Sequence, residues 1–584
     1  MKPSSKKEAA TVAWRPTVAG SHYAASCGHY LATAAAMRVL DAGGNAIDAG
    51  VTAAIALTVL QPDVVSFAGV LPTLVYMKAE NTVVSLEGLG YWPASTDVAR
   101  LKAEGGDAVP EGILRQIVPA APATHVEALR RFGTISYEQA ATPAMQLARD
   151  GYYMYPILRD SIELHAAGID RYTENKSIFR PGGRTPEVGS RFRQTNLAHT
   201  IGRMIEAERN AAGDRKAKLR AVHDCFYKGS IAKEIAAFHR KHRGFLTLED
   251  LAGFEVPVAK GISTTYKGIE IHACDVWCQG VVLLQTLKAL EGIDLVSLGH
   301  NTPKYLHMLA QALDLSFADR EVYVGDPKFT HVPTAQLLSA EYAARQRDRI
   351  DPERAARRMP DPGEIADVRH PSLASLMPGK ARDTGKVPIA PDTIYSCVAD
   401  AYGNVWSATP SDTMYDTPMI DGLGINISTR GMQGRLLETH PCSVAPGKRP
   451  RLTPSPALAF KDDSFLMAWG SPGGDIQVQS MLQVFLNVNE FGQQMQQAIE
   501  APRVGTFNFP NSFSPHAYLP GRLCVENRFP EADVLALEKM GYDIEMWQAR
   551  SWSMGSVCAI LRDPKTGLLH AGADPRREAY AMAW

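Results

Sequence analysis

A threonine begins a predicted strand directly after a long loop, in the run PDTIYSCVAD of residues 391–400. The hydroxyl of Thr393 can attack the carbonyl carbon of Asp392 and shift the acyl group from nitrogen to oxygen. Hydrolysis of that ester leaves Thr393 as a new N-terminus, whose α-amine has an ordinary pKa of about 7.7–8.0. This amine can take the proton of the adjacent hydroxyl, so one residue supplies nucleophile and base without a histidine or a metal. The spacing therefore predicts self-cleavage before Thr393, followed by attack on amides.

Such a nucleophile also needs hydrogen-bond donors for the oxyanion of the tetrahedral intermediate, and losing one donor costs about 10²–10³ in rate. The run WGSPGGD at residues 469–475 follows a predicted strand. Gly473 and Gly474 can present backbone N–H groups there without obstruction by side chains. Ser411, just after a predicted hairpin, could steady the nucleophile. Each feature has a structural alternative, because threonines that begin strands and Gly-Gly pairs that end them also occur in ordinary turns.

Periodicity and turn signals predict the elements that must position these residues. Downstream of Thr393 the chain is β-rich, with hairpins at 394–398/405–408 and 456–460/465–470 and a helix over 477–490. Upstream we expect helices over 29–40 and 48–60, short strands at 74–76 and 82–86, a mostly helical stretch from 136 to 250, and a helix starting near Pro303. Residues 351–391 are rich in Pro, Arg, Asp and Gly and predict a long exposed loop.

Composition narrows the class of partner. The 584 residues include 61 basic and 62 acidic side chains, a net charge of -1, so the chain has no overall field for nucleic acid or anionic membrane. The longest apolar stretch, residues 49–60, is too short to span a bilayer. No apolar leader segment is evident near the N-terminus, and the sequence predicts a cytoplasmic protein. The eight cysteines are scattered and predict buried free thiols, and neither a metal nor a cofactor is predicted.

Several short motifs, in order along the chain, resemble those of the γ-glutamyltranspeptidase family. They are LDAGGNAIDA at 40–49, FADR at 317–320, GDP at 325–327, the Thr393 segment itself, KRP at 448–450, SPGG at 471–474, APR at 501–503 and DPR at 574–576. The resemblance implies an α+β fold, the four-layer αββα sandwich of N-terminal nucleophile hydrolases. It also implies cleavage between Asp392 and Thr393 into a large segment, 1–392, and a small segment, 393–584. The two would stay associated as one catalytic unit, and a homodimer of that unit is left open.

The residues by which the family holds a γ-glutamyl group do not carry over. An Arg position aligns with Leu89, a Ser-Ser pair with Leu452-Thr453, and an Asn with Thr413. The Gln/Glu and Asp that hold the α-amine fall near Arg430 and Gln433. A buried carboxylate and ammonium need charge-assisted partners worth about 1.5–3 kcal/mol each. We therefore predict that the chain cleaves a different small-molecule amide or acyl bond, with water or an amine as acceptor.

Some alternatives remain open at this point. Arg430 either faces the pocket and pairs with a substrate carboxylate, or is a surface or structural arginine. Leu89 and its aromatic neighbours either line an apolar acyl pocket or belong to the core. The chain could instead be a true glutathione hydrolase or γ-glutamyl transferase. Ile394 and Ser411 stand where the family often has Thr, which also keeps open an uncleaved, non-catalytic binding protein.

Overall fold

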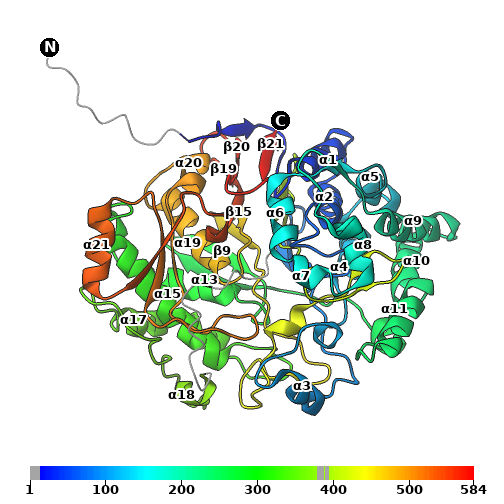
Figure 1. Ribbon diagram of the computed structural model, residues 1–584. Helices are drawn as coiled ribbons and strands as arrows, with labels where there is room; N and C mark the ends of the chain where they lie inside the picture. Colours follow the sequence, from blue (N-terminus) through cyan, green and yellow to red (C-terminus); the bar gives the residue numbers. More distant parts are fainter. Residues whose placement is uncertain (1–12, 378–386, 388–392) are drawn as a thin grey trace.

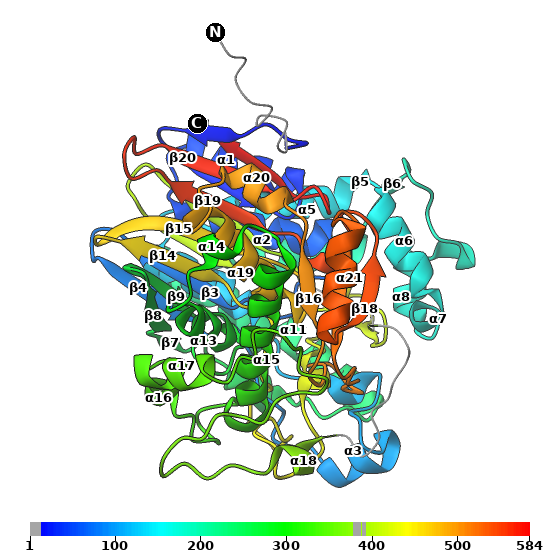
Figure 2. The same cartoon turned by 90° about the vertical axis from the view of Figure 1, so that its left-hand side faces the viewer.

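Two antiparallel sheets lie face to face at the centre of the molecule (Figures 1 and 2). The computed structural model describes residues 13–377, 387 and 393–584. In this part of the chain each large sheet has seven strands. The first sheet has the order β1-β20-β19-β15-β14-β9-β8. Its strands are β1 (Val18–Gly20), β8 (Ile262–Tyr266), β9 (Ile269–Ala273), β14 (Ala457–Lys461), β15 (Ser464–Gly470), β19 (Cys558–Arg562) and β20 (Leu569–Ala573).

The second sheet has the order β21-β2-β10-β11-β3-β4-β7. Its strands are β2 (Ala24–Cys27), β3 (Thr73–Met77), β4 (Thr82–Leu86), β7 (Val258–Ala259), β10 (Ser396–Ala399), β11 (Val405–Ala408) and β21 (Tyr580–Ala583). β10 pairs with β11, and β14 pairs with β15, so both predicted hairpins are confirmed. The β10–β11 hairpin occupies the middle of its sheet, where side chains on both faces are buried.

The two sheets share an apolar core. Leu74 and Cys397 from the second sheet pack with Leu458, Ala468 and Ile560 from the first in one buried cluster. All five are fully buried. Removal of this apolar surface from water stabilises the sandwich by about 25 cal/mol per Å², which holds the hairpin after Thr393 against the strand that leads to Gly473.

One layer of helices covers the outer face of the second sheet. It comprises α1 (Tyr30–Asp41), α2 (Ala46–Leu60), α4 (Ala121–Phe132), α5 (Tyr137–Asp150), α9 (Thr195–Asn210) and α10 (Arg215–Tyr227). Every residue of α2 is buried, because this helix lies between the sheet and the outer helices. Asn45 and Asp48 form a capping box at its start, which satisfies backbone N–H groups that would otherwise lack partners. The predicted helices in this region are confirmed.

A second helical layer covers the first sheet. It comprises α13 (Gly280–Leu290), α15 (Pro303–Tyr323), α17 (Ala340–Arg347), α19 (Ile476–Asn489) and α20 (Met495–Glu500). Thr302 caps α15 and Pro303 occupies its first turn, as the sequence predicts. The order helices, sheet, sheet, helices is the predicted four-layer αββα arrangement of an α+β protein (Figure 2).

Smaller elements surround the sandwich. They are the sheet β16 (Val504–Thr506), β17 (Arg522–Glu526) and β18 (Asp543–Trp547), the ribbons β5 (Tyr152–Tyr153) with β6 (Arg191–Phe192) and β12 (Met419–Ile420) with β13 (Ile425–Asn426), and the helices α3 (Val98–Gly105), α6 (Pro156–Leu164), α7 (Ala166–Ile169), α8 (Thr173–Phe179), α11 (Ser230–Lys241), α12 (Leu248–Ala252), α14 (Leu295–Leu298), α16 (Thr334–Leu337), α18 (Leu373–Leu376) and α21 (Glu531–Met540). Residues 351–372 contain neither helix nor strand and are mostly exposed, in agreement with the predicted loop. The remainder of that loop up to Asp392, except Met377, Val387 and the short helix α18, lies outside the described residues.

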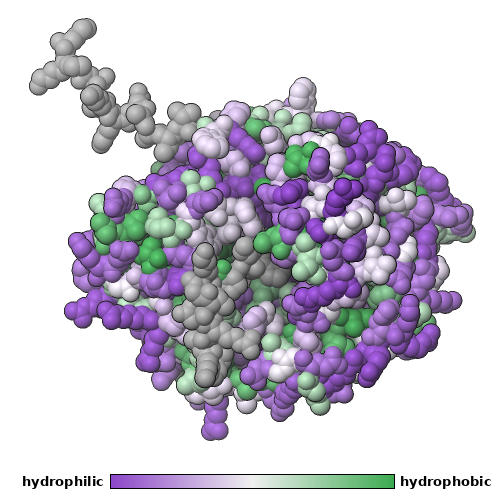
Figure 3. All heavy atoms as spheres, in the orientation of Figure 1, coloured by the Kyte–Doolittle hydropathy of each residue, from purple (hydrophilic) through white to green (hydrophobic). Residues whose placement is uncertain are grey.

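Both sheets combine strands from the two sides of residue 392. β10 and β11 of the small segment lie between β2 and β3 of the large one, and β14 pairs with β9. Hydrophilic residues cover much of the face seen in Figure 3. Among the described residues, every helix is too short or too polar to cross a membrane. The described residues before and after residue 392 therefore share the same two sheets.

Candidate active site at Thr393

Thr393 lies beside Ser411 at the mouth of the central hairpin. The two residues form an isolated antiparallel bridge just before β10 and just after β11, and both are fully buried. The N–H of Ile394 donates to the carbonyl of Pro410 at 3.1 Å. Ser411 exchanges two backbone hydrogen bonds with Val70, at 3.1 and 3.2 Å. The backbone thus fixes the Thr393 hydroxyl next to that of Ser411, and the catalytic role of the two residues stays a prediction.

Among the described residues, the side chains of Ser411 and Gln477 contact the Thr393 hydroxyl. Its Oγ1 lies 2.8 Å from Ser411 Oγ and 3.1 Å from the side-chain amide of Gln477. The other end of that amide is 3.2 Å from the carbonyl oxygens of both Thr453 and Ser471. Carbonyl oxygens only accept, so the amide nitrogen faces them and Gln477 Oε1 accepts from the Thr393 hydroxyl.

Arg430 lies on the far side of Ser411. It begins the 3₁₀ helix η3 (Arg430–Gln433), is fully buried, and donates through Nη2 to Ser411 Oγ. Its Nε is 3.8 Å from Asp412 Oδ1. Burial raises the pKa of Asp412, and Arg430 acts in the opposite direction. Asp412 also accepts from Ser428 Oγ and from the Thr429 N–H, each at 2.7 Å. Arg430 is therefore not a surface residue: it forms a buried ion pair beside the candidate nucleophile.

These contacts define a direction for the hydrogen bonds. Arginine has donors only, so Ser411 Oγ accepts from Arg430. These three hydrogen bonds can form together if the Ser411 hydroxyl donates to Thr393 Oγ1 and the Thr393 hydroxyl donates to Gln477 Oε1. Hydrogen bonds to charged groups contribute about 1.5–3 kcal/mol, more than neutral ones. A cation at the head of this chain of bonds favours negative charge on the Thr393 oxygen.

Gly473 and Gly474 lie between the end of β15 and the start of α19. Their φ values of 122° and 59° lie in the region that favours glycine. Their carbonyl groups accept from Ile476 and Gln477 in the first turn of α19, at 3.0 and 3.3 Å. Within the described ranges neither glycine N–H donates a hydrogen bond. The two N–H groups add to the positive end of the α19 dipole, one turn from the Gln477 side chain that contacts Thr393.

Buried polar side chains hold this glycine loop in place. Asp475 pairs with Arg320 and accepts from the Ser512 N–H at 2.8 Å. Gln279 accepts from Arg320 at 2.9 Å and donates to the carbonyl of Gly474 at 3.1 Å. Ordering of the loop by several partners means that its N–H groups need little rearrangement to meet an oxyanion.

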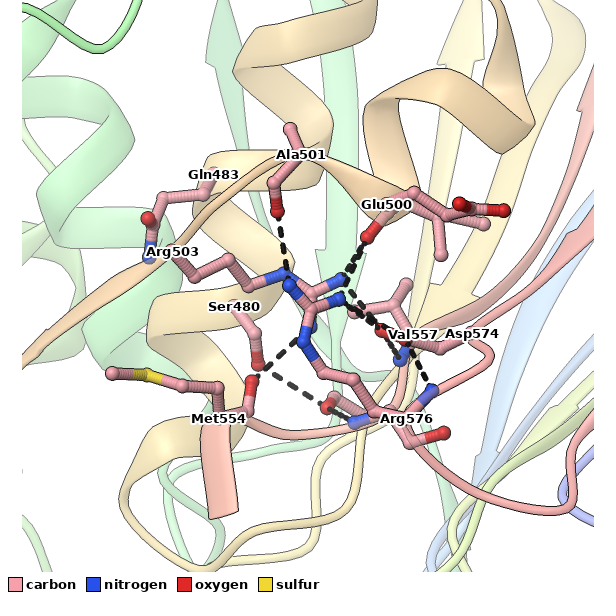
Figure 4. A network of polar contacts seen from close by, with 12 residues as sticks. Ser480, Gln483, Glu500, Ala501, Arg503, Met554, Val557, Asp574 and Arg576 are labelled. Atoms are coloured by element: carbon pink, nitrogen blue, oxygen red, sulfur yellow. Dashed lines mark hydrogen bonds and ion pairs between the residues drawn. The ribbon is translucent and has the colours of Figure 1, made fainter. Parts of the chain in front are cut away.

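A second polar network supports the loop from the C-terminal side (Figure 4). Asp574 forms ion pairs with Arg503 at 2.7 Å and with Arg576 at 3.0 Å. Arg503 also donates to the carbonyl of Met554 at 3.1 Å. The next residue, Gly555, has φ 79°, and a Cβ there would lie 2.5 Å from Ser471 Oγ. The network thus fixes a turn that packs directly on the strand-to-helix loop containing Gly473.

The remaining predicted residues lie in three different places. Gln433 Nε2 donates to Thr453 Oγ1 at 3.0 Å, and both side chains are buried. Thr413 lines a cavity of about 390 Å³ two residues from Ser411. Leu89 is 1% exposed and packs in the inter-sheet core with Leu452. Contact with substrate stays a prediction for each of them, and Asp392 lies outside the described residues.

Gln477 and Asp412 are the residues that sequence reasoning missed. Gln477 marks the predicted helix start, and a glutamine one turn after a Gly-Gly pair was the available signal. Asp412 lies between Ser411 and Thr413 and has a φ of 140°, which no sequence pattern indicated. In the described ranges seven cysteines are buried and Cys225 is half-buried, all with free thiols, and no group of His, Cys, Asp or Glu could hold a metal ion.

Comparison with known proteins gives a consistent result. The Gamma-glutamyltranspeptidase family profile matches residues 32–584. The chain is 29% identical to the glutathione hydrolase-like YwrD proenzyme of Bacillus subtilis (strain 168), over 95% of this chain and 97% of that protein. It is 31% identical to the acylase ACY 1 proenzyme of Pseudomonas sp. (strain SE83), over 88% and 86%.

Solved structures with the same fold include LmbA2991HD and the cephalosporin acylase from Bacillus halodurans. LmbA2991HD superposes with a TM-score of 0.90 at 33% identity, covering 98% of this chain and 100% of that one. The cephalosporin acylase superposes with a TM-score of 0.83 at 28% identity, covering 99% of each chain.

Proposed function

The chain belongs to the γ-glutamyltranspeptidase family, and from this premise we propose that it is a self-processing hydrolase with Thr393 as its nucleophile. Relatives in the family are named as hydrolase and acylase proenzymes, and the chain is an enzyme of this class acting on amide or acyl bonds. One observation carries the choice of nucleophile: the Thr393 hydroxyl contacts Ser411 and Gln477, one helical turn from the Gly473–Gly474 amides.

In the processing step, Thr393 Oγ bonds to the carbonyl carbon of Asp392 and the peptide C–N bond breaks. The nitrogen takes up a proton and becomes the α-amine of Thr393. Water then hydrolyses the ester, which returns the hydroxyl to Thr393 and leaves a carboxylate on Asp392. Arg430, acting through Ser411, would favour the oxygen anion that forms during the attack.

In turnover, the neutral α-amine accepts the hydroxyl proton while Oγ attacks the substrate carbonyl. The N–H groups of Gly473 and Gly474 would bind the oxyanion at the start of α19. Collapse of the intermediate expels the amine, which leaves with the proton, and forms an ester on Thr393. Water or an amine then attacks the ester and regenerates the enzyme.

We further propose that the usual substrate is not a γ-glutamyl compound. Arg430 stands where the family resemblance places a partner of the substrate ammonium, and two like charges repel. The position expected to hold the α-carboxylate is Leu89, which packs in the core. The acylase relatives are consistent with this choice. The glutathione hydrolase names among other relatives favour the γ-glutamyl alternative.

The wild-type protein and two variants test the proposal. Purified wild type should give two bands on a denaturing gel, near two-thirds and one-third of the 63.5 kDa chain. Thr393→Ala should stay whole and inactive, and Thr393→Ser should be cleaved and active because it keeps the hydroxyl. A wild-type chain that stays intact on long incubation would support the non-catalytic alternative. Faster turnover of γ-glutamyl-p-nitroanilide than of simple acyl anilides would contradict the substrate proposal.

A further inference from the structure

A cavity of about 390 Å³ is lined by Thr413, which follows Ser411 by two residues. Its apolar lining comprises Val64, Ile157, Leu164, Tyr415 and Trp552. Small-molecule sites in proteins commonly enclose about 300–1,000 Å³ and are lined mainly by apolar and aromatic side chains. The cavity therefore has the size and the walls of a pocket for a small apolar group.

Two lining residues of the cavity belong to chain segments that contain Ser411 or pack against the loop before α19. Thr413, in its lining, follows Ser411 by two residues, and the intervening Asp412 donates its N–H to the Val64 carbonyl at 3.1 Å. On the other side, Trp552 begins the turn that continues to Gly555, which packs against Ser471. The lining thus includes one residue from the segment that contains Ser411 and one from the turn that packs against Ser471.

Three polar residues of the lining, Ser161, His165 and Tyr415, contact one another. The Tyr415 hydroxyl pairs with Ser161 Oγ, and the Tyr415 ring stacks on His165 with centroids 3.6 Å apart. His165 Nδ1 lies 2.9 Å from the Ser161 carbonyl. Burial lowers the pKa of His165, so the ring is neutral at pH 7.

The charged part of the lining gives a free carboxylate little attraction. Three of its acidic side chains already form ion pairs: Asp416 with Arg115, Glu111 with Arg171, and Asp160 with Arg159. Asp63 is a fourth acidic member. The basic member, Arg577, lies over the Trp552 ring at 5.1 Å and donates to the Trp552 carbonyl at 3.2 Å. Among the residues that the structure describes, the lining thus contains one arginine and no lysine beside four acidic side chains, so it offers a carboxylate few cationic partners.

We propose that this cavity is the acyl pocket and that it takes an uncharged apolar acyl group, aromatic or branched aliphatic, presented as an amide. The inference rests on the proposed function, because the carbonyl carbon of such a group must reach Thr393. The enzyme would then select its substrate by the apolar part of the acyl group and not by a charged substituent.

The test uses processed full-length protein and the p-nitroanilides of phenylacetic, acetic, glutaric and γ-glutamic acids. Phenylacetyl anilide should be cleaved with a kcat/KM at least about tenfold above that of acetyl, the scale expected for added apolar contact in a pocket. Ile157→Trp, which narrows the cavity, should lower the phenylacetyl-to-acetyl ratio by about tenfold. Ile157→Ala, which widens the cavity, should raise the kcat/KM of a bulkier naphthylacetyl anilide relative to that of acetyl anilide. Leu535→Trp, on the exposed surface of α21, is the matched control and should leave the ratio unchanged.

The outcomes separate the two proposals. A preference for glutaryl anilide, or an unchanged ratio in both Ile157 variants, would overturn the pocket inference while turnover itself upheld the proposed self-processing hydrolase. A preference for γ-glutamyl anilide would overturn both the pocket inference and the substrate proposal. If processed wild type cleaved none of the anilides, the proposed function would fail first. Self-cleavage on a gel shows in each case that a variant has folded.

Discussion

We expect the positive charge of Arg430, which donates to Ser411 Oγ, to control the reactivity of Thr393. Arg430→Gln should lower kcat by about tenfold to a hundredfold, because a charged hydrogen bond contributes about 1.5–3 kcal/mol. Loss of a nearby cation raises the pKa of the Thr393 α-amine. A smaller fraction of the amine is then neutral at a given pH, so the acid limb of the kcat profile should move to higher pH.

Arg430→Gln also leaves Asp412 buried without its cation, which destabilises a protein by about 3–5 kcal/mol. The double variant Arg430→Gln/Asp412→Asn is the control, because it removes both charges and restores stability. A recovered melting temperature together with a shifted pH profile would identify a role through Ser411. A profile that stays at the wild-type position in both variants would leave Arg430 a purely structural residue.

Gln477 offers a second test at the residue scale. Gln477→Glu keeps the shape but places a carboxylate 3.1 Å from the Thr393 hydroxyl and 3.2 Å from two carbonyl oxygens. Self-cleavage should slow by about a hundredfold or more at pH 8, since a negative charge opposes the forming oxyanion. The rate should rise as the pH falls and the carboxyl group gains a proton. The rate of self-cleavage is measured on denaturing gels from pH 5 to 8 for the variant and the wild type. Equal rates at every pH would show that Gln477 does not act on the Thr393 hydroxyl.

The candidate nucleophile could be identified from the sequence, but its surroundings only in part. Thr393 and Ser411 flank a hairpin whose turn signals are local, so their proximity follows from strand pairing. Gln477 meets them because α19 packs on the first sheet while the hairpin belongs to the second. No local sequence pattern indicates that the start of α19 approaches the β10–β11 hairpin. The partnership of Arg430 with Asp412 depends likewise on the path of residues 413–429, where the family resemblance aligned poorly.

At the scale of elements, the loop from β15 to α19 must hold two amides at fixed positions. A Cβ on Gly473 would meet Ile476 at 3.3 Å, and the residue has φ 122°. Gly473→Ala should cost about 1–3 kcal/mol of stability through strain and lower kcat by about 10²–10³ through misplaced donors. The control is Gly492→Ala, near the other end of α19, which has φ 64° and open space around a Cβ. It should destabilise the fold without lowering kcat, and equal losses in both variants would contradict the oxyanion assignment.

The hairpins, α2, α15 and α19 were predicted because each carries its own signal, such as alternation, capping residues or an apolar face. The order of strands in the sheets was not available from those signals. β10 pairs with β2 across more than half of the chain, and β20 pairs with β1. Only the family resemblance supplied the layered architecture before the structure did.

At the scale of the whole molecule, the network in Figure 4 couples stability to pH. Burial acts to raise the pKa of both Asp574 and Glu526, but neighbouring arginines outweigh it and hold both pKa values below their ordinary range. Carboxyl groups with lowered pKa values stabilise the fold above their unfolded pKa of about 4, and that stability is lost as the pH falls through the folded value. The melting temperature should therefore drop below about pH 4.

Asp574→Asn removes one of these titrations and should flatten the acid dependence of the melting temperature. At pH 7 it should also lower stability by about 3–5 kcal/mol, because Arg503 loses its buried partner. Arg149→Gln is a control, since Arg149 forms an exposed ion pair with Asp150 at the surface. Melting curves from pH 3 to 7 provide the comparison. An acid dependence identical to wild type would show that the network does not control acid stability.

The most direct measurement is mass spectrometry of the small segment, before and after brief exposure to a slowly hydrolysed acyl ester or amide. The account predicts a segment whose N-terminal residue is Thr393 and whose mass increases by one acyl group, located by fragmentation on that residue. A new N-terminus elsewhere, or an adduct on any other side chain, would contradict the central claim that one threonine both cuts the chain and carries the acyl group.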